Sequence, residues 1–167
     1  VAAVQAKLEA EGLADNTLIL FTSDNGGAWY VGMPGLNRPY RGWKATFFEG
    51  GIRAPMFARW PAHINAGTQV KGVGSHLDLF ATAAAAANAA VPADRVIDSQ
   101  NLLPQLTTGA PIPARTLFWR SGDYRVVRDG DWKLQVSARP DRVWLHNLAD
   151  DPTEQRDKVA SPRRFNG

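Results

Sequence analysis

The sequence contains no cysteine among its 167 residues. This absence excludes disulfide bonds, thiolate metal sites and a cysteine nucleophile within these residues. It leaves the cellular compartment open, because cytosolic and exported bacterial proteins can both lack cysteine. The sequence also lacks an apolar run of membrane-spanning length: its longest candidate, residues 81–90, is mostly alanine and is interrupted by Asn88. We therefore expect no membrane partner.

The sequence has no dense basic stripe. Its 19 basic and 16 acidic residues give a net charge of +3, and Arg163 and Arg164 form the only adjacent basic pair. A nucleic-acid-binding protein usually gathers its basic residues on one face, so we expect no nucleic-acid partner. The slight basic excess fits an anionic substrate. Hydrophobic residues make up 44% and charged residues 21%, which is typical of a soluble globular domain.

The first elements predict an α/β fold. Val1, Val4 and Leu8 form an apolar helical stripe in residues 1–11, and Gly12 is a suitable stop. Residues 17–22 are apolar and β-prone, which predicts a strand buried on both faces. A helix that leads directly into such a strand is half of a βαβ unit, so we expect a parallel sheet. A start inside a helix also indicates a chain cut from a longer protein.

Residues 23–51 form a long segment that is rich in glycine and also carries scattered aromatic side chains. A loop of this length inside a compact domain is usually functional or disordered, and the aromatic residues argue against disorder. A second strand is expected over residues 54–60. Ser75 and Asp78 resemble a capping box that opens a helix extending to about Ala90.

The sequence pattern changes in the C-terminal third of the chain, where short strand signals follow one another. After a proline-rich connection over residues 92–113, four short strands are expected, and Asp129-Gly130 between the middle two is a strong hairpin signal. The expected strands are residues 116–120, 124–128, 132–136 and 143–146. We interpret this region as a small antiparallel sheet, followed at residues 150–154 by a turn and a helix start.

The strongest candidate for chemistry is the pair Asp24 and Asn25, which follows the first strand. Ligands of open α/β sheets bind beyond the carboxyl ends of strands. A carboxylate and an amide oxygen side by side suit a hard divalent cation such as calcium or magnesium. The alternative is that Asp-Asn-Gly-Gly is simply a turn, for which these residue types are equally well suited.

The segments around this pair resemble the sulfatase family of the alkaline-phosphatase-like superfamily. Residues 41–55 read Arg-Gly-Trp-Lys-Ala-Thr-Phe-Phe-Glu-Gly-Gly-Ile-Arg-Ala-Pro, which is similar to the family's lysine followed by a Glu-Gly-Gly-x-Arg-x-Pro segment. Residues 75–82 resemble the family's next helix, residues 129–134 its C-terminal hairpin, and residues 144–154 its usual ending. The order and spacing of these segments are what make the resemblance specific.

The resemblance implies a role for three residues. Asp24 and Asn25 correspond to two ligands of the family's calcium ion, and Lys44 corresponds to a lysine that contacts the sulfate group. A fixed ammonium and a metal can stabilise the negative charge that sulfate-ester cleavage develops. Lys44 could instead be a solvated loop lysine. For Glu49 and Arg53 we favour a structural ion pair over substrate contact.

Other titratable residues carry weaker expectations. His76 lies inside the capping box, so we favour a surface or packing role over an acid–base role. His63 and His146 have no identifiable partners in the sequence. Trp29 and its aromatic neighbours in the long loop could line a substrate mouth or pack the loop.

The rest of a sulfatase site is absent from the sequence. The family's Cys/Ser-x-Pro-x-Arg motif, whose Cys or Ser becomes formylglycine, is missing, and residues 161–164 have the wrong spacing for it. The paired aspartates that complete the calcium site also lie N-terminal in the family. Two side-chain ligands are too few for tight calcium binding, so we expect the isolated chain to be inactive and to bind metal weakly or not at all.

These observations predict part of a sulfuric ester hydrolase that acts on a sulfate-ester substrate. The resemblance slightly favours a periplasmic or secreted protein. We expect residues 1–112 to be the C-terminal part of a large α/β domain with a partial parallel or mixed sheet. Residues 113–167 should form a small subdomain of antiparallel sheet and helix. Without the missing N-terminal part, exposed strand edges and an apolar helix face predict self-association.

Two alternatives stay open. The chain could belong to a phosphate or phosphonate monoester hydrolase of the same superfamily, although an Asp-Asn pair favours the one-calcium sulfatase type. It could also be a non-catalytic module that binds sulfated glycans through its aromatic loop.

Overall fold

The computed structural model describes residues 1–33 and 35–159. The segment 161–164, which has a superficial likeness to the nucleophile motif, lies outside the described residues. The chain forms two compact units, and each unit draws on two separate stretches of sequence. Unit 1 comprises residues 1–22 and 56–113, and unit 2 comprises residues 23–55 and 114–167. The division of the protein into domains at residues 112 and 113 stays a prediction.

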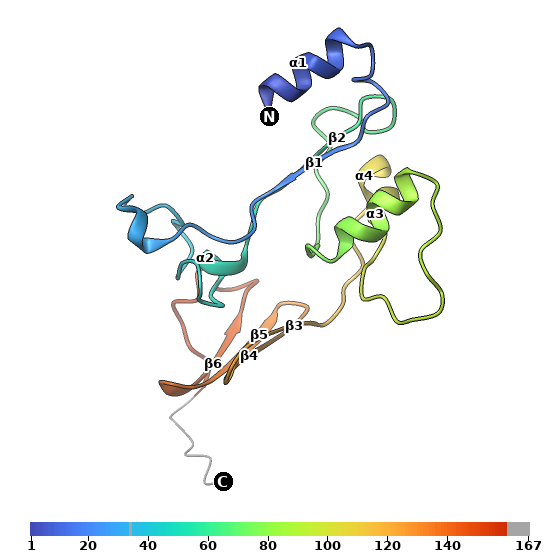
Figure 1. The fold of residues 1–167 in the computed structure, drawn as a ribbon. Coiled ribbons are helices and arrows are strands. Elements are labelled where there is room, and N and C mark those ends of the chain that lie inside the picture. The colour runs from blue at the N-terminus through green and yellow to red at the C-terminus, as the bar shows by residue number, and fades with distance from the viewer. Residues whose placement is uncertain (34, 160–167) are drawn as a thin grey trace. The chain divides into compact units, whose positions relative to one another are not determined.

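Unit 1 contains three helices and a two-stranded sheet (Figure 1). Its elements are α1 (Ala2–Ala10), β1 (Ile19–Thr22), β2 (Met56–Arg59), α3 (Asp78–Ala86) and α4 (Leu103–Thr108). The helices expected near residues 1–11 and 75–90 and the strands expected at residues 17–22 and 54–60 are confirmed. Helix α4 falls in the segment that we interpreted as a simple connection. None of the described helices is long and apolar enough to cross a membrane.

The expected parallel sheet is wrong for the described residues. Strands β1 and β2 pair in antiparallel fashion, from Ile19 opposite Arg59 to Thr22 opposite Met56. A parallel pair needs a crossover connection, usually a helix, between its strands. The described residues among 23–55 form one short 3-10 turn and one four-residue helix and no crossover helix, so the chain returns beside β1 in the opposite direction.

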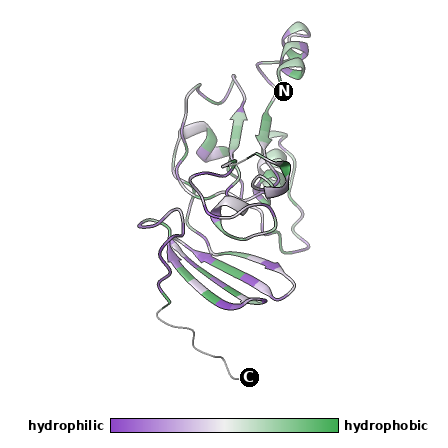
Figure 2. Ribbon diagram, turned by 90° about the vertical axis from the view of Figure 1, so that its left-hand side faces the viewer, coloured by the Kyte–Doolittle hydropathy of each residue, from purple (hydrophilic) through white to green (hydrophobic). Residues whose placement is uncertain are grey.

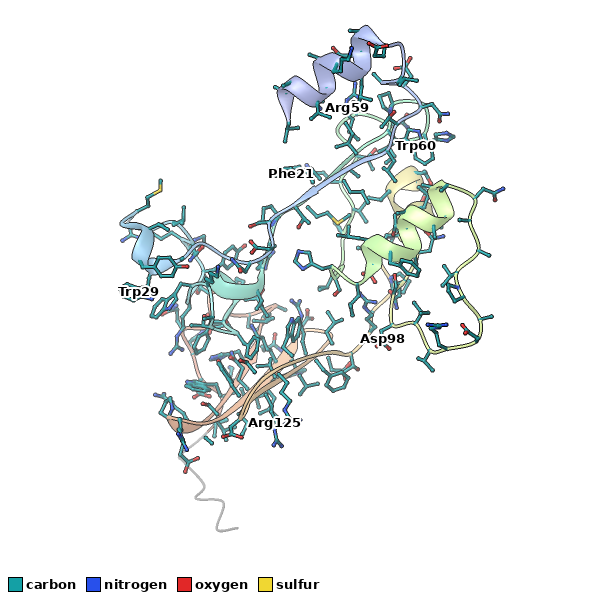
Figure 3. All side chains as sticks on the ribbon, viewed as in Figure 1. Phe21, Trp29, Arg59, Trp60, Asp98 and Arg125 are labelled. Carbon is teal, nitrogen blue, oxygen red and sulfur yellow. The ribbon has the colours of Figure 1, made fainter. Side chains whose placement is uncertain are left out.

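The apolar sequence of β1 predicts a strand buried on both faces, but the strand is partly exposed. The Phe21 side chain, which projects from β1 in Figure 3, is 46% exposed, and its neighbour Phe57 on β2 is 63% exposed. An apolar strand is buried only when elements cover both faces of its sheet. The described part of the chain supplies no such cover for these rings.

Helix α3 is fixed to the following segment by buried polar side chains. The Asp78 carboxylate accepts hydrogen bonds from the backbone N–H groups of Ser75 (2.8 Å) and Gln100 (2.8 Å). The Thr82 hydroxyl accepts a hydrogen bond from the Leu102 N–H at 3.0 Å. The Asp78 bond to Ser75 is the reciprocal contact that a capping box predicts.

Unit 2 contains the four-stranded antiparallel sheet that the sequence predicts. Its strands are β3 (Leu117–Ser121), β4 (Tyr124–Asp129), β5 (Trp132–Ala138) and β6 (Asp141–Asn147), paired in that order. Asp129 pairs with Trp132, so Gly130 occupies the first turn position with a φ of 54°. A positive φ at the first turn position is typical of type II′ hairpin turns, which favour glycine there. Residues 150–154 form a turn, but no helix follows within the described residues.

Strand β5 buries its polar side chains and exposes its apolar ones. Lys133, Gln135 and Ser137 are buried, whereas the alternate residues of the strand are exposed. Hydrophilic and hydrophobic residues alternate along the strands of this sheet in Figure 2. Buried polar groups need partners, so the inner face of β5 must meet other polar groups of unit 2.

The remaining elements of unit 2 lie in the long loop. They are the 3-10 helix η1 (Trp29–Val31) and the short helix α2 (Glu49–Ile52). Phe48, directly before α2, packs edge-on against Trp144 of β6 at a centroid distance of 5.5 Å. The Arg41 guanidinium lies over the Phe48 ring, 4.0 Å from its centroid. These contacts attach α2 to the inner face of the sheet.

Candidate functional site

The loop after β1 is shaped by local hydrogen bonds. The Asn25 backbone N–H donates to Asp24 Oδ1 at 3.0 Å, and the Ser23 hydroxyl donates to the Asn25 carbonyl at 2.8 Å. The Asn25 side-chain nitrogen donates to the Gly26 carbonyl at 2.9 Å. This last bond uses the nitrogen of the side-chain amide and not the oxygen, which is the atom that a hard cation would bind. The turn interpretation and the ligand interpretation are therefore compatible at this loop.

Two glycine-rich segments meet directly behind this loop. The Gly26 N–H donates to the Gly51 carbonyl at 2.8 Å. A Cβ atom on Gly26 would lie 1.8 Å from the Gly50 carbonyl oxygen, a distance that no side chain could tolerate. The absence of side chains at Gly26 and Gly50 lets the two backbones approach this closely. The contact joins the Asp24–Asn25 loop to helix α2.

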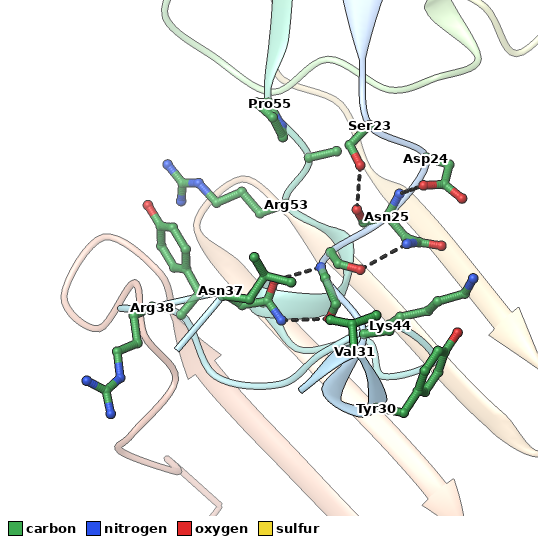
Figure 4. A pocket seen from close by; sticks show the side chains of 17 residues that line it. Ser23, Asp24, Asn25, Tyr30, Val31, Asn37, Arg38, Lys44, Arg53 and Pro55 are labelled. Atoms are coloured by element: carbon green, nitrogen blue, oxygen red, sulfur yellow. Dashed lines mark hydrogen bonds between the residues drawn. The ribbon is translucent and has the colours of Figure 1, made fainter. Parts of the chain in front are cut away.

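The three predicted site residues line one open cavity of about 830 Å³. Asp24, Asn25 and Lys44 extend toward the same side of the loop in Figure 4. Arg38 and Arg53 also line the cavity, so three of its side chains are cationic. A cavity with a carboxylate at one position and several cations around it can accept an anion together with a divalent cation.

The oxygen atoms of Asp24 and Asn25 suit calcium, but they form only part of a site. Hard cations take six or more oxygen ligands, and this pair offers two side chains. No group of three or more His, Cys, Asp or Glu residues that could hold a metal ion occurs within residues 1–33 and 35–159. The donor set therefore fits calcium in type and falls short in number.

Glu49 forms the predicted ion pair with Arg53, at 3.6 Å, but its closest partner is another residue. The Lys133 ammonium on β5 lies 2.9 Å from Glu49 Oε1 and 3.0 Å from Glu154 Oε1. Lys133 and Glu154 are completely buried, and Glu49 is nearly so. The Glu49 N–H also donates to Glu154 Oε2 at 2.5 Å. This buried triad, Glu49–Lys133–Glu154, accounts for the polar inner face of β5.

The environment of the triad perturbs two pKa values. Burial raises the pKa of Glu154, and the nearby Lys133 ammonium partly opposes this effect. Burial also raises the pKa of Tyr124 to about 12, and its hydroxyl hydrogen-bonds to Gln135 Oε1 at 2.5 Å. Neither group faces the cavity that holds Asp24, so both perturbations are structural.

The three histidines do not join the predicted site. His76 is exposed in unit 1 and lies 3.4 Å from the Thr22 hydroxyl. His63 stacks against Trp60 with a centroid distance of 4.0 Å. His146 is completely buried, and burial lowers its pKa. The surface or packing role that we favoured for His76 is consistent with its exposed position, and His63 has a partner, Trp60, that the sequence did not identify.

Sequence reasoning missed Asn37, which binds the loop backbone next to the site. Its side chain hydrogen-bonds to Gly27 and Gly42. The only available signal was an asparagine in a segment rich in glycine and proline, which is typical of any loop. It also missed Lys133 and Glu154, because ion pairing between residues so far apart along the chain leaves no local pattern.

Known proteins match the chain in sequence. The Sulfatase family matches residues 1–89. N-acetylgalactosamine-6-sulfatase from Homo sapiens is 46% identical over 114 residues, which are 66% of this chain and 22% of that protein. Steryl-sulfatase from Rattus norvegicus is 45% identical over 112 residues, which are 64% of this chain and 19% of that protein. The chain therefore spans about a fifth of the length of these curated relatives.

Solved structures match the fold over nearly the whole chain. The crystal structure of Ps i-CgsB in complex with k-i-k-neocarrahexaose aligns with a TM-score of 0.80 at 30% identity, covering 94% of this chain and 35% of that one. The PsFucS1 sulfatase from Pseudoalteromonas sp. aligns with a TM-score of 0.76 at 26% identity, covering 94% and 36%. The family match covers more than half of the chain, and the chain belongs to the sulfatase family.

Proposed function

We propose that this chain forms the C-terminal side of the active site of a sulfuric ester hydrolase. In this proposal Asp24 and Asn25 are two ligands of a calcium ion, and Lys44 contacts the sulfate group of a sulfate-ester substrate. The observation that carries the proposal is the shared cavity, which brings these three side chains together from the two parts of the long loop before and after η1. The nucleophile and the remaining calcium ligands would come from residues outside this chain.

Each residue has a role that its chemistry can perform. Cleavage of a sulfate ester develops negative charge on the sulfuryl oxygens and on the leaving oxygen. The exposed Lys44 ammonium can stabilise that charge without donating a proton. Asn25 adds an oxygen ligand without adding charge, so the cation keeps more of its positive field. Calcium would supply electrostatic stabilisation of the sulfate oxygens when bound.

One observation favours the non-catalytic alternative. Trp29 is 70% exposed and Tyr30 is 64% exposed, and they contact each other edge-on at 6.1 Å. Trp29 and Trp43 also line a second cavity of about 240 Å³. Exposed aromatic rings are suited to contact with sugars as well as to packing. A sulfated-glycan-binding role would therefore use these rings without requiring Lys44 or Asp24.

A hybrid enzyme tests the proposal. Residues 1–167 would replace the matching part of N-acetylgalactosamine-6-sulfatase, expressed in cells that install formylglycine. We expect the hybrid to hydrolyse an aryl sulfate, and we expect Asp24→Ala and Lys44→Ala each to lower kcat/KM by about 100-fold or more. Lys71→Ala, which removes an exposed lysine of unit 1, is the matched control and should leave turnover unchanged.

Three results would overturn the proposal. They are a folded hybrid without turnover, turnover that survives both site substitutions, and preferential hydrolysis of an aryl phosphate, which would favour the phosphatase alternative. If the hybrid fails to fold, a calcium titration of the isotope-labelled chain replaces it, followed by NMR at calcium concentrations high enough to detect the weak binding expected of two ligands. Selective shifts of the amide signals of residues 24–27 support the proposal. Equal shifts at exposed acidic residues such as Asp94 and Asp141 contradict it.

A further inference from the structure

Asn37 holds two separate loops of the candidate site through its side chain. Its Oδ1 accepts a hydrogen bond from the Gly27 N–H at 2.7 Å. Its Nδ2 donates to the Gly27 carbonyl at 2.8 Å and to the Gly42 carbonyl at 3.2 Å. The side-chain amide therefore pairs with both backbone groups of Gly27, as a neighbouring strand would, and reaches a second segment as well.

The Gly27 carbonyl is shared with the site lysine. The Lys44 backbone N–H donates to this same oxygen at 3.2 Å. Gly27 is two residues after Asn25, and Gly42 is two residues before Lys44. The amide of Asn37 thus lies between the loop that carries the candidate metal ligands and the loop that carries the candidate sulfate contact.

The fit around Gly27 is tight. A Cβ atom there would lie 2.0 Å from Leu36 Cδ2 and 3.1 Å from Asn37 Oδ1. Leu36 and Asn37 both line the same cavity as Asp24 and Lys44. An ordinary loop asparagine caps one turn of its own segment, whereas Asn37 reaches a backbone ten residues away.

We propose that Asn37 is a positioning residue that sets the separation between the Asp24–Asn25 loop and Lys44. The inference rests on the proposed function for its meaning, because it concerns the geometry of that same site. Asn37 does not contact substrate or metal in this proposal. It acts through Gly27 and Lys44.

The test uses the full chain labelled with nitrogen-15 and compares the native sequence with Asn37→Ala, Asn37→Asp and the control Asn147→Ala. Asn147 is a matched control because its side chain also hydrogen-bonds to the backbone at two places in unit 2, its Oδ1 accepting from the N–H groups of Ala149 and Asp150. The probes are manganese(II), which broadens NMR signals near the metal, and amide hydrogen exchange.

We expect manganese to broaden the amides of Asp24, Asn25 and Lys44 in the native chain and in Asn147→Ala. In Asn37→Ala the broadening at Asp24 and Asn25 should persist while that at Lys44 is lost, and the Gly27 amide should exchange faster. Asn37→Asp keeps the acceptor for the Gly27 N–H but loses both donated bonds. It should preserve protection of Gly27 and still lose the broadening at Lys44.

Unchanged broadening at Lys44 in Asn37→Ala, or an equal loss in Asn147→Ala, would overturn the inference. If manganese does not broaden Asp24 and Asn25 even in the native chain, either the two available ligands hold too little metal in the isolated chain or the proposed function fails, and the hybrid enzyme separates these two cases. In either case, amide hydrogen exchange at Lys44 tests the positioning role by itself. Faster exchange in Asn37→Ala but not in Asn147→Ala supports the positioning role, and equal exchange in both refutes it.

Discussion

Replacement of Lys133 by methionine should destabilise unit 2 strongly. The substitution keeps most of the length of the side chain and removes its charge. The Lys133 ammonium is fully buried and lies within 3.0 Å of carboxylate oxygens of both Glu49 and Glu154. Removing one partner of a buried ionic group leaves the other charges uncompensated, which typically costs about 3–5 kcal/mol. The variant would leave two buried carboxylates close together.

The structure places the expected cost near the lower end of that range. Glu49 Oε2 keeps two further cations, Arg53 at 3.6 Å and Arg128 at 3.8 Å, and Arg53 is half exposed. A pair at 2.9 Å is worth roughly 6 kcal/mol at an effective dielectric constant of about 20, before the cost of desolvating the ammonium is subtracted. We therefore expect a loss of about 3 kcal/mol in the free energy of unfolding.

Urea unfolding followed by tryptophan fluorescence measures this loss, because Trp144 is buried within the same unit. With a slope of about 2 kcal/mol per molar urea, the midpoint should fall by about 1.5 M. Lys158→Met is the matched control. Lys158 is exposed in unit 2, and its replacement should change the free energy of unfolding by less than about 0.5 kcal/mol.

The pH dependence gives a second, independent check. Burial already raises the pKa of Glu154 above its usual value of 4.5, and loss of Lys133 should raise it further. A carboxyl group with a raised pKa in the folded state stabilises the fold at low pH and loses that contribution as the pH rises through the folded pKa. The loss of unfolding free energy caused by Lys133→Met should therefore be smaller near pH 4.5 than at pH 7. A loss below about 1 kcal/mol at pH 7, or a deficit independent of pH, would refute the reasoning.

Three further predictions concern other parts of the chain. Asp78→Ala leaves two backbone N–H groups without their acceptor and should cost about 3 kcal/mol, measured by urea unfolding, whereas a cost below about 1 kcal/mol would contradict the structure. His146 is buried with a lowered pKa, so the fold should lose stability as the pH falls below 6.5, and His146→Phe should abolish that loss without costing stability at pH 7. Phe21 and Phe57 are exposed on the two-stranded sheet, so we expect the chain to self-associate and Phe57→Lys to reduce the mass measured by light scattering; a native chain that is monomeric at high concentration would sink this idea.

The sequence predicted the secondary structure well where local signals dominate. The C-terminal meander follows from alternating residues and from Gly130 at its hairpin, and both signals are local. The sequence did not predict the direction of β2, because pairing depends on how residues 23–55 return along the sheet. It also gives no indication that β5 turns Lys133 inward, since an apolar alternate face normally predicts the opposite orientation.

The candidate site was predictable only with the family resemblance. Asp24 and Asn25 on their own are equally good turn residues, and the cavity shared with Lys44 depends on the meeting of two loops. The Asn37 amide and the carboxylate of Glu154 act on residues distant in sequence, so no periodicity or spacing reveals them. Contacts of this kind follow from tertiary structure, which local propensity does not encode.

The buried triad also has a consequence for the order of events during synthesis. Glu49 and Lys133 are separated by 84 residues along the chain. A ribosome that adds about 5–20 residues per second would produce Lys133 roughly 4–17 s after Glu49. During that interval the glycine-rich segment exists without the ammonium that neutralises Glu49 and without the sheet on which Phe48 packs. Helix α2 therefore acquires its buried ionic and aromatic partners only after β5 and β6 have been synthesised.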